Sequence, residues 1–185
     1  LMESLASTSD ELMEKFFEGE EISREEAVEA IHQGIIHGDI VPVICGCATN
    51  LWGISNLLDA IVESFPRHTA KKEETIIVNG EETPLTIEPT GIPAIFVFKT
   101  VADPFVGKMS FFKVMQGQIR KDTVLLNSTN GQQEKIAHIY TMKGKKQTEV
   151  DSLECGDIGM VAKLVNTNTN DTLSINGNIT YAPTV

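Results

Sequence analysis

Apolar residues in the front of the chain recur at helical spacing between acidic stretches. Their spacing of three and four residues predicts a helix over 9–18. A second helix is predicted from Ser23 to Gly38, because Ser23-Arg24-Glu25-Glu26 fits a capping box and glycine favours helix ends. A third, amphipathic helix is predicted from Ile54 up to Pro66.

Between the last two predicted helices lies a short apolar run over 40–45, rich in β-branched residues. Such a run is typical of a buried parallel strand. A loop follows, Gly46-Cys47-Ala48-Thr49-Asn50. The order helix, helix, strand, loop, helix is that of the end of an α/β domain. One strand cannot make a sheet, so residues 1–66 are predicted to be an incomplete domain.

Residues 67–91 are more polar and are predicted to be a linker. Asn79-Gly80 is a strong turn dipeptide between two short apolar runs, which indicates a small hairpin within this linker.

The pattern changes to alternation with a period of two from Ile92 onward. Glycines and Gly-Asp or Asn-Gly pairs punctuate it. Strands are predicted over 93–101, 108–116, 123–127, 134–142, 158–165 and 172–175. Six short strands with regular turns predict a closed antiparallel β-barrel over 92–185, and the fold class is α+β.

The net charge of −11 is unevenly distributed. Residues 1–65 contain 13 acidic and 2 basic side chains, whereas the segment from residue 92 onward contains 10 basic and 8 acidic ones. The acidic front would repel phosphate, and the back of the chain would tolerate or weakly attract it. Acidic helices are also commonly just solvated surfaces.

The chain offers no complete catalytic or metal site. Cys45-Gly46-Cys47 lacks a second Cys or His pair at zinc-binding spacing, so no metal site is predicted. The four histidines are scattered, and neither a phosphate loop nor a G-x-G-x-x-G motif occurs. We therefore predict no catalytic residues within this chain.

The segment Lys143-Gly144-Lys145-Lys146 is a basic turn. It is predicted to be either a solvated hairpin tip or a contact to an RNA phosphate backbone through Lys143, Lys145 and Lys146.

No apolar run approaches the length of a membrane span, and the N-terminus has no secretory signal pattern. Three cysteines do not make a disulfide framework, so a cytoplasmic location and no membrane partner are predicted.

Two segments resemble bacterial translation elongation factor G or a close paralogue. One runs from Ile40-Val41-Pro42-Val43-Ile44-Cys45-Gly46-Cys47-Ala48 through Gly53 to Phe65-Pro66. The other begins Ala102-Asp103-Pro104-Phe105-Val106-Gly107-Lys108 and continues through Gly156-Asp157-Ile158-Gly159 to Asp171-Thr172-Leu173. The first is similar to the end of the family's P-loop GTPase domain, and the acidic front to part of its inserted subdomain. The second is similar to the family's β-barrel second domain.

The resemblance implies that Cys47, Ala48 and Thr49 are the family's last guanine-contacting loop, in which the alanine backbone N–H contacts the guanine oxygen. The family has serine where this chain has Cys47, and lysine where it has Asn50. The whole protein is then expected to be a GTPase using GTP or GDP with Mg²⁺. This segment alone is expected neither to bind nor to hydrolyse GTP.

The same resemblance implies a function in tRNA–mRNA translocation on the ribosome. The expected partners are small-subunit ribosomal RNA for the barrel and the ribosomal stalk protein for the acidic helices. Two alternatives stay open: a ribosomal-protection (tetracycline-resistance type) or release-type GTPase, and a free-standing binding module with no nucleotide link.

Overall fold

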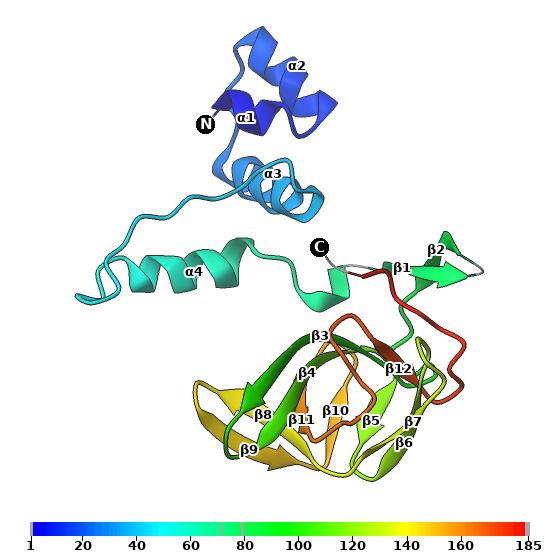
Figure 1. Cartoon of the computed structure of the whole chain (residues 1–185). Coiled ribbons are helices and arrows are strands. Elements are labelled where there is room, and N and C mark those ends of the chain that lie inside the picture. Colours follow the sequence, from blue (N-terminus) through cyan, green and yellow to red (C-terminus); the bar gives the residue numbers. More distant parts are fainter. Residues whose placement is uncertain (1, 71, 79, 184–185) are drawn as a thin grey trace. The chain divides into compact units, whose positions relative to one another are not determined.

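The computed structural model describes residues 2–70, 72–78 and 80–183. The chain forms two compact units that divide between Ala70 and Lys71. The first unit is helical and the second is built from strands (Figure 1).

The helices of the first unit begin and end at residues whose side chains or backbone favour helix ends. Ser9 Oγ accepts from the backbone N–H of Leu12, and Gly38 ends its helix in the left-handed conformation at φ 84°. The predictions over 9–18, from Ser23 to Gly38 and from Ile54 are confirmed. The first short helix was not predicted. The elements are α1 (Met2–Ala6), α2 (Asp10–Glu18), α3 (Arg24–His37), α4 (Ile54–Ser64) and the 3₁₀ turn η1 (His68–Ala70).

A small apolar core holds the front of this unit together. It contains one buried side chain from each of α1, α2 and α3 and one from the connection between α2 and α3. Its buried members are Leu5, Leu12, Ile22 and Ala30, with Ala27, Ile31 and Ile40 packed against them.

The predicted buried strand over 40–45 is wrong. No strand forms there, and Val41 and Val43 are 78% and 87% exposed. A parallel strand exists only when neighbouring strands satisfy its N–H and C=O groups. The described part of the first unit supplies no such neighbour. Likewise α4 has no buried residue, and Val62 on it is 82% exposed.

The second unit begins with an antiparallel hairpin, β1 (Glu73–Val78) and β2 (Glu81–Thr86). Gly80 adopts φ 86° at its turn, while Asn79 lies outside the described residues. The backbone N–H of Ile77 donates to the carbonyl of Thr180 at 2.7 Å, and Ile76 packs with Tyr181. The segment predicted to be a linker therefore carries a hairpin that packs on the barrel.

The barrel is a curled antiparallel sheet with the strand order β7-β6-β12-β3-β4-β11-β8-β9. A separate pair, β5 and β10, packs against the same core. Its strands are β3 (Ala94–Asp103), β4 (Gly107–Gln116), β5 (Gln118–Arg120), β6 (Thr123–Asn127), β7 (Gln133–Ile136), β8 (Ile139–Lys143), β9 (Lys146–Val150), β10 (Ser152–Glu154), β11 (Ile158–Ala162) and β12 (Thr172–Ser174).

The core inside the curled sheet is fully apolar and takes side chains from both the sheet and the β5–β10 pair. Ile119 of β5 and Leu153 of β10 are its members from that pair. The others are Ile95, Val97, Phe112, Val114, Leu125, Ile136, Ile139, Val161, Leu164 and Leu173. Burial of this apolar cluster favours the curling of the sheet around it.

The sequence-based strands are corrected in three respects. The strand predicted over 134–142 is two strands, because β7 pairs with β6 whereas β8 pairs with β9 and β11. The polar strand β9 and the short strands β5 and β10 were not predicted. The sheet is curled but not closed, since its edge strands β7 and β9 do not pair with each other.

Candidate functional site

The loop predicted to contact guanine is tightly closed. The backbone N–H of Cys47 donates to the carbonyl of Trp52 at 2.9 Å, and the reverse bond measures 3.1 Å. A Cβ on Gly53, which has φ 74°, would lie 2.6 Å from the Cys45 carbonyl oxygen. Only glycine lets the backbone at position 53 come this close to the Cys45 carbonyl. Gly53 in the sequence therefore determines how the loop closes.

Within this loop the Cys47 side chain forms a hydrogen bond with another residue of the loop. Cys47 Sγ lies 3.2 Å from Thr49 Oγ1. This hydrogen bond, with further ones from the backbone of Asn50 and Thr49, lowers the pKa of the Cys47 thiol. Cys47 and Thr49 therefore brace each other, and Ala48 between them is exposed. This arrangement leaves the loop at Ala48 open to solvent.

The three lysines of the basic turn come together at the tip of the β8–β9 hairpin. Lys143 pairs with Lys146 in the register, and Lys145 lies in the turn between the strands. All three are exposed. None of the ion pairs found among the described residues uses them. They belong to the second unit, whereas the Cys47 loop belongs to the first.

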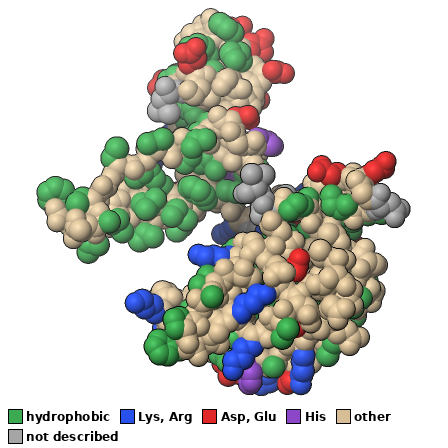
Figure 2. Space-filling model, in the orientation of Figure 1, with side chains coloured by type: hydrophobic (Ala, Val, Ile, Leu, Met, Phe, Trp, Pro, Cys, Tyr) green, Lys and Arg blue, Asp and Glu red, His purple; other side chains and the backbone are tan. Residues whose placement is uncertain are grey.

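Basic side chains are also spread over the visible face of the barrel. Figure 2 shows Lys and Arg there with some acidic side chains among them, while acidic side chains also gather on the helices of the first unit and near the β1–β2 hairpin. The division follows the charge asymmetry of the sequence.

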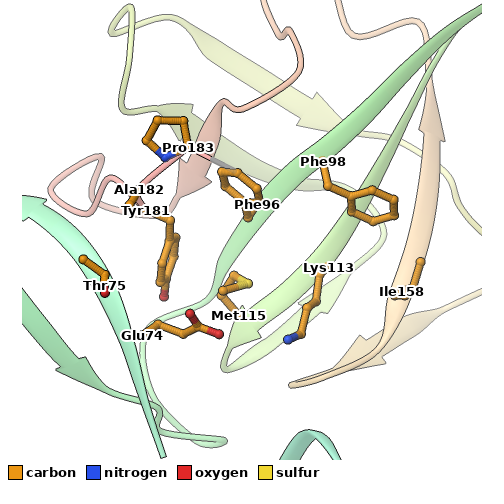
Figure 3. A pocket seen from close by; sticks show the side chains of 10 residues that line it. All are labelled: Glu74, Thr75, Phe96, Phe98, Lys113, Met115, Ile158, Tyr181, Ala182 and Pro183. Atoms are coloured by element: carbon orange, nitrogen blue, oxygen red, sulfur yellow. The ribbon is translucent and has the colours of Figure 1, made fainter. Parts of the chain in front are cut away.

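An apolar pocket of about 530 Å³ opens on the barrel surface, and the sequence did not predict it. Figure 3 shows Glu74 of β1, Lys113 and Met115 of β4, and Tyr181 of the C-terminal segment reaching into one recess. Burial, and secondarily the charge of Glu74, raises the pKa of the Tyr181 hydroxyl. The pocket joins residues far apart in the chain, so no local motif could reveal it. Its lining residues are Glu74, Thr75, Phe96, Phe98, Lys113, Met115, Ile158, Tyr181, Ala182 and Pro183.

The structure assembles no metal cluster among the described residues. His138 Nδ1 lies 2.8 Å from Glu149 Oε1 in an exposed pair, and His32 Nδ1 lies 3.2 Å from the Ser64 carbonyl. The described residues thus present three surface features: a braced loop, a basic hairpin tip and an apolar pocket.

The curled antiparallel sheet around its apolar core makes the second unit a partly open β-barrel domain. Its particular kind follows from the family comparison, in which residues 93–176 match the model of elongation factor G domain 2. This match confirms the resemblance to elongation factor G carried by the sequence from Ala102 to Leu173.

A protein of known crystal structure from Thermus thermophilus is similar to both units. It shares 25% sequence identity with the chain, with a TM-score of 0.68 over 98% of the chain. The match confirms the α+β fold class. The chain spans 26% of the length of that protein. Across the described residues, no helix has the length and apolar character needed to cross a membrane.

Proposed function

We propose that the chain is part of a ribosome-associated translation factor of the elongation factor G kind, which promotes tRNA–mRNA translocation. The observation that carries this proposal is the match of residues 93–176 to elongation factor G domain 2. The small coverage of the Thermus thermophilus protein supports the view that further domains complete the factor. GTP hydrolysis then belongs to the whole protein and not to this segment.

In this proposal the barrel docks on small-subunit ribosomal RNA. Its apolar core makes it a rigid spacer, and the exposed lysines at the β8–β9 tip can reach phosphates without reading sequence. The acidic helices of the first unit repel RNA and instead contact a protein, the ribosomal stalk.

The Cys47 loop supplies the guanine contact in the complete factor. Its residues fit that role, because the Cys47–Thr49 hydrogen bond fixes the turn while Ala48 stays exposed. Bound GTP with Mg²⁺ would supply the switch between two ribosome-binding states. This chain's own contribution is to hold the Ala48 backbone in place.

Binding to isolated small ribosomal subunits across a salt series tests the docking role. We expect log K to fall linearly with log salt, since lysines displace counterions from phosphates. Changing Lys143, Lys145 and Lys146 together to alanine should reduce that slope by about one for each lysine that contacts a phosphate. Lys135→Ala is the control, because Lys135 is already paired with Asp122 at 2.7 Å. An unchanged slope in the triple variant would remove the tip from the interface, and no binding at all would contradict the docking role.

The translocation role is tested with the complete gene. It should restore growth to a strain depleted of its elongation factor G. Tetracycline resistance without restored growth would instead assign the ribosomal-protection role. A free-standing module would give neither phenotype and no salt-dependent binding to ribosomal subunits.

A further inference from the structure

The apolar pocket lies where β1 meets the outer surface of β3, β4 and β11. Phe96 of β3, Met115 of β4 and Tyr181 are buried members of the small apolar cluster beneath the β1–β2 hairpin, and all three line the pocket. Phe98 and Ile158 also line it but are exposed. The hairpin therefore covers only part of this apolar surface, and the pocket is the part that stays open.

Two β-bulges bring side chains into the pocket. The pairing of β3 with β4 shifts register twice, and one residue at each shift is left over in the register. That residue is Met115 in β4 and Phe98 in β3, and both line the pocket. A bulge changes the direction of a side chain and is common beside functional sites. The two bulges together point to a binding site at this place.

Tyr181 supplies a polar group on the apolar floor of the pocket. Its ring packs edge-on against Phe96 with the ring centroids 6.5 Å apart, and its backbone N–H donates to Thr172 Oγ1 at 2.9 Å. The residue is only 4% exposed, and Figure 3 shows its hydroxyl directed toward Glu74. None of the hydrogen bonds found among the described residues uses this hydroxyl. Because burial keeps it protonated, it can donate to a bound molecule.

Two opposite charges lie at the polar side of the pocket. Lys113 is half-buried, and none of the ion pairs found in the described part of the chain uses its ammonium. It lies opposite Phe96 in one neighbouring strand and Ile158 in the other, so its stem crosses apolar surface. Glu74 approaches from β1, and its two carboxylate oxygens can accept from several donors (Figure 3). The pocket thus offers a cation and an anion beside aromatic rings.

We propose that the apolar pocket binds a small zwitterion with an aromatic body, the chemistry of a free aromatic amino acid. The aromatic body lies against the rings of Phe96 and Phe98. The ligand carboxylate accepts from Lys113 Nζ and the Tyr181 hydroxyl, and the ligand ammonium donates to the Glu74 carboxylate. The pocket volume of about 530 Å³ lies within the range of about 300–1,000 Å³ that is usual for small-molecule sites. The inference goes beyond the proposed function and does not depend on it.

Titration of the full chain with L-tryptophan tests the site, followed by the NMR signal of the Met115 methyl group, which Met115→Leu assigns. We expect a saturable shift with a dissociation constant on the order of 1 mM. Tryptamine lacks the carboxylate and indolepropionate lacks the ammonium, so each should bind about tenfold more weakly. L-alanine, which has no aromatic body, should leave the signal unchanged.

Substitutions separate the polar contacts. Tyr181→Phe removes only the hydroxyl and should weaken L-tryptophan binding about tenfold, as should Lys113→Gln. Lys113→Gln should leave tryptamine binding unchanged, because tryptamine has no carboxylate. Tyr140→Phe and Lys99→Gln are the matched controls, since neither residue lines the pocket, and both should bind L-tryptophan as the parent does. Unchanged thermal unfolding of each variant shows that its fold is intact.

Three results would overturn the inference. One is the absence of a saturable shift at Met115, and another is equal binding of tryptophan, tryptamine and indolepropionate. The third is binding by this chain but not by the complete factor, which would show that another part of that protein covers the pocket. The proposed function is judged separately, because Tyr181→Phe should bind small ribosomal subunits as the parent does. Failure of the parent to bind those subunits would contradict the proposed function alone.

Discussion

At the scale of single residues, Gly159 shows how one missing side chain decides packing. It lies in β11 opposite Phe112, and a Cβ there would come within 2.7 Å of the Phe112 ring and closer still to Leu153. Both neighbours are buried core residues, so moving them aside disturbs the packing of the core. We predict that Gly159→Ala destabilises the barrel by about 1–3 kcal/mol through overpacking, measured by urea unfolding.

Gly131→Ala is the control, because open space surrounds Gly131 and only its left-handed backbone adds a cost, about 1 kcal/mol. Equal effects of the two substitutions would contradict the packing argument.

At the scale of elements, the capping box shows how α3 is held at its start. Ser23 Oγ accepts from the backbone N–H of Glu26, whose carboxylate accepts from the Ser23 backbone N–H and from Lys15 of α2. We predict that Ser23→Ala lowers stability by about 1 kcal/mol, measured by the thermal unfolding of the helical signal. Ser7→Ala, at an exposed serine after α1, is the control.

The same element gives a pH dependence. The hydrogen bond from Lys15, followed by those from Ser23, lowers the pKa of Glu26 from 4.5 to about 2. A depressed carboxyl pKa stabilises the fold above the unfolded-state value, and this stabilisation is lost as pH falls from about 4.5 to about 2. In Glu26→Gln, the helical signal should fall less than in the parent as the pH drops from about 4.5 to about 2. If the acid titration curves of the parent and the variant have the same shape, the assignment of this pH dependence to Glu26 is refuted.

At the scale of the whole molecule, the two units differ in how much they bury. The described barrel strands enclose a core of fully buried side chains, whereas α4 buries no residue and the segment over 41–46 is exposed throughout. Local stability follows buried contacts, so amides of α4 should exchange with deuterium well before those of β4 and β11. Hydrogen-exchange mass spectrometry measures this order. Protection of α4 equal to that of β4 would show that a cover for its apolar residues exists in solution.

The sequence by itself determined the elements whose causes are local. Helix ends at Ser23 and Gly38, the amphipathic α4 and the long strands β3 and β4 follow from capping chemistry and periodicity within a few residues. The resemblance to elongation factor G likewise rested on continuous segments, and the match over 93–176 confirmed it.

Only the tertiary structure decided features that depend on distant partners. Residues 40–45 have strand-like composition but no neighbouring strand among the described residues, so they form no strand and lie mostly exposed. The polar β9 is a strand because β8 pairs with it, and the break between β7 and β8 exists because each joins a different neighbour. The loop after β11 meets the start of β4 because the backbone N–H of Lys163 donates to the Lys108 carbonyl. Hydrogen bonds and burial between segments far apart in the chain fixed these features, and local periodicity carries no record of them.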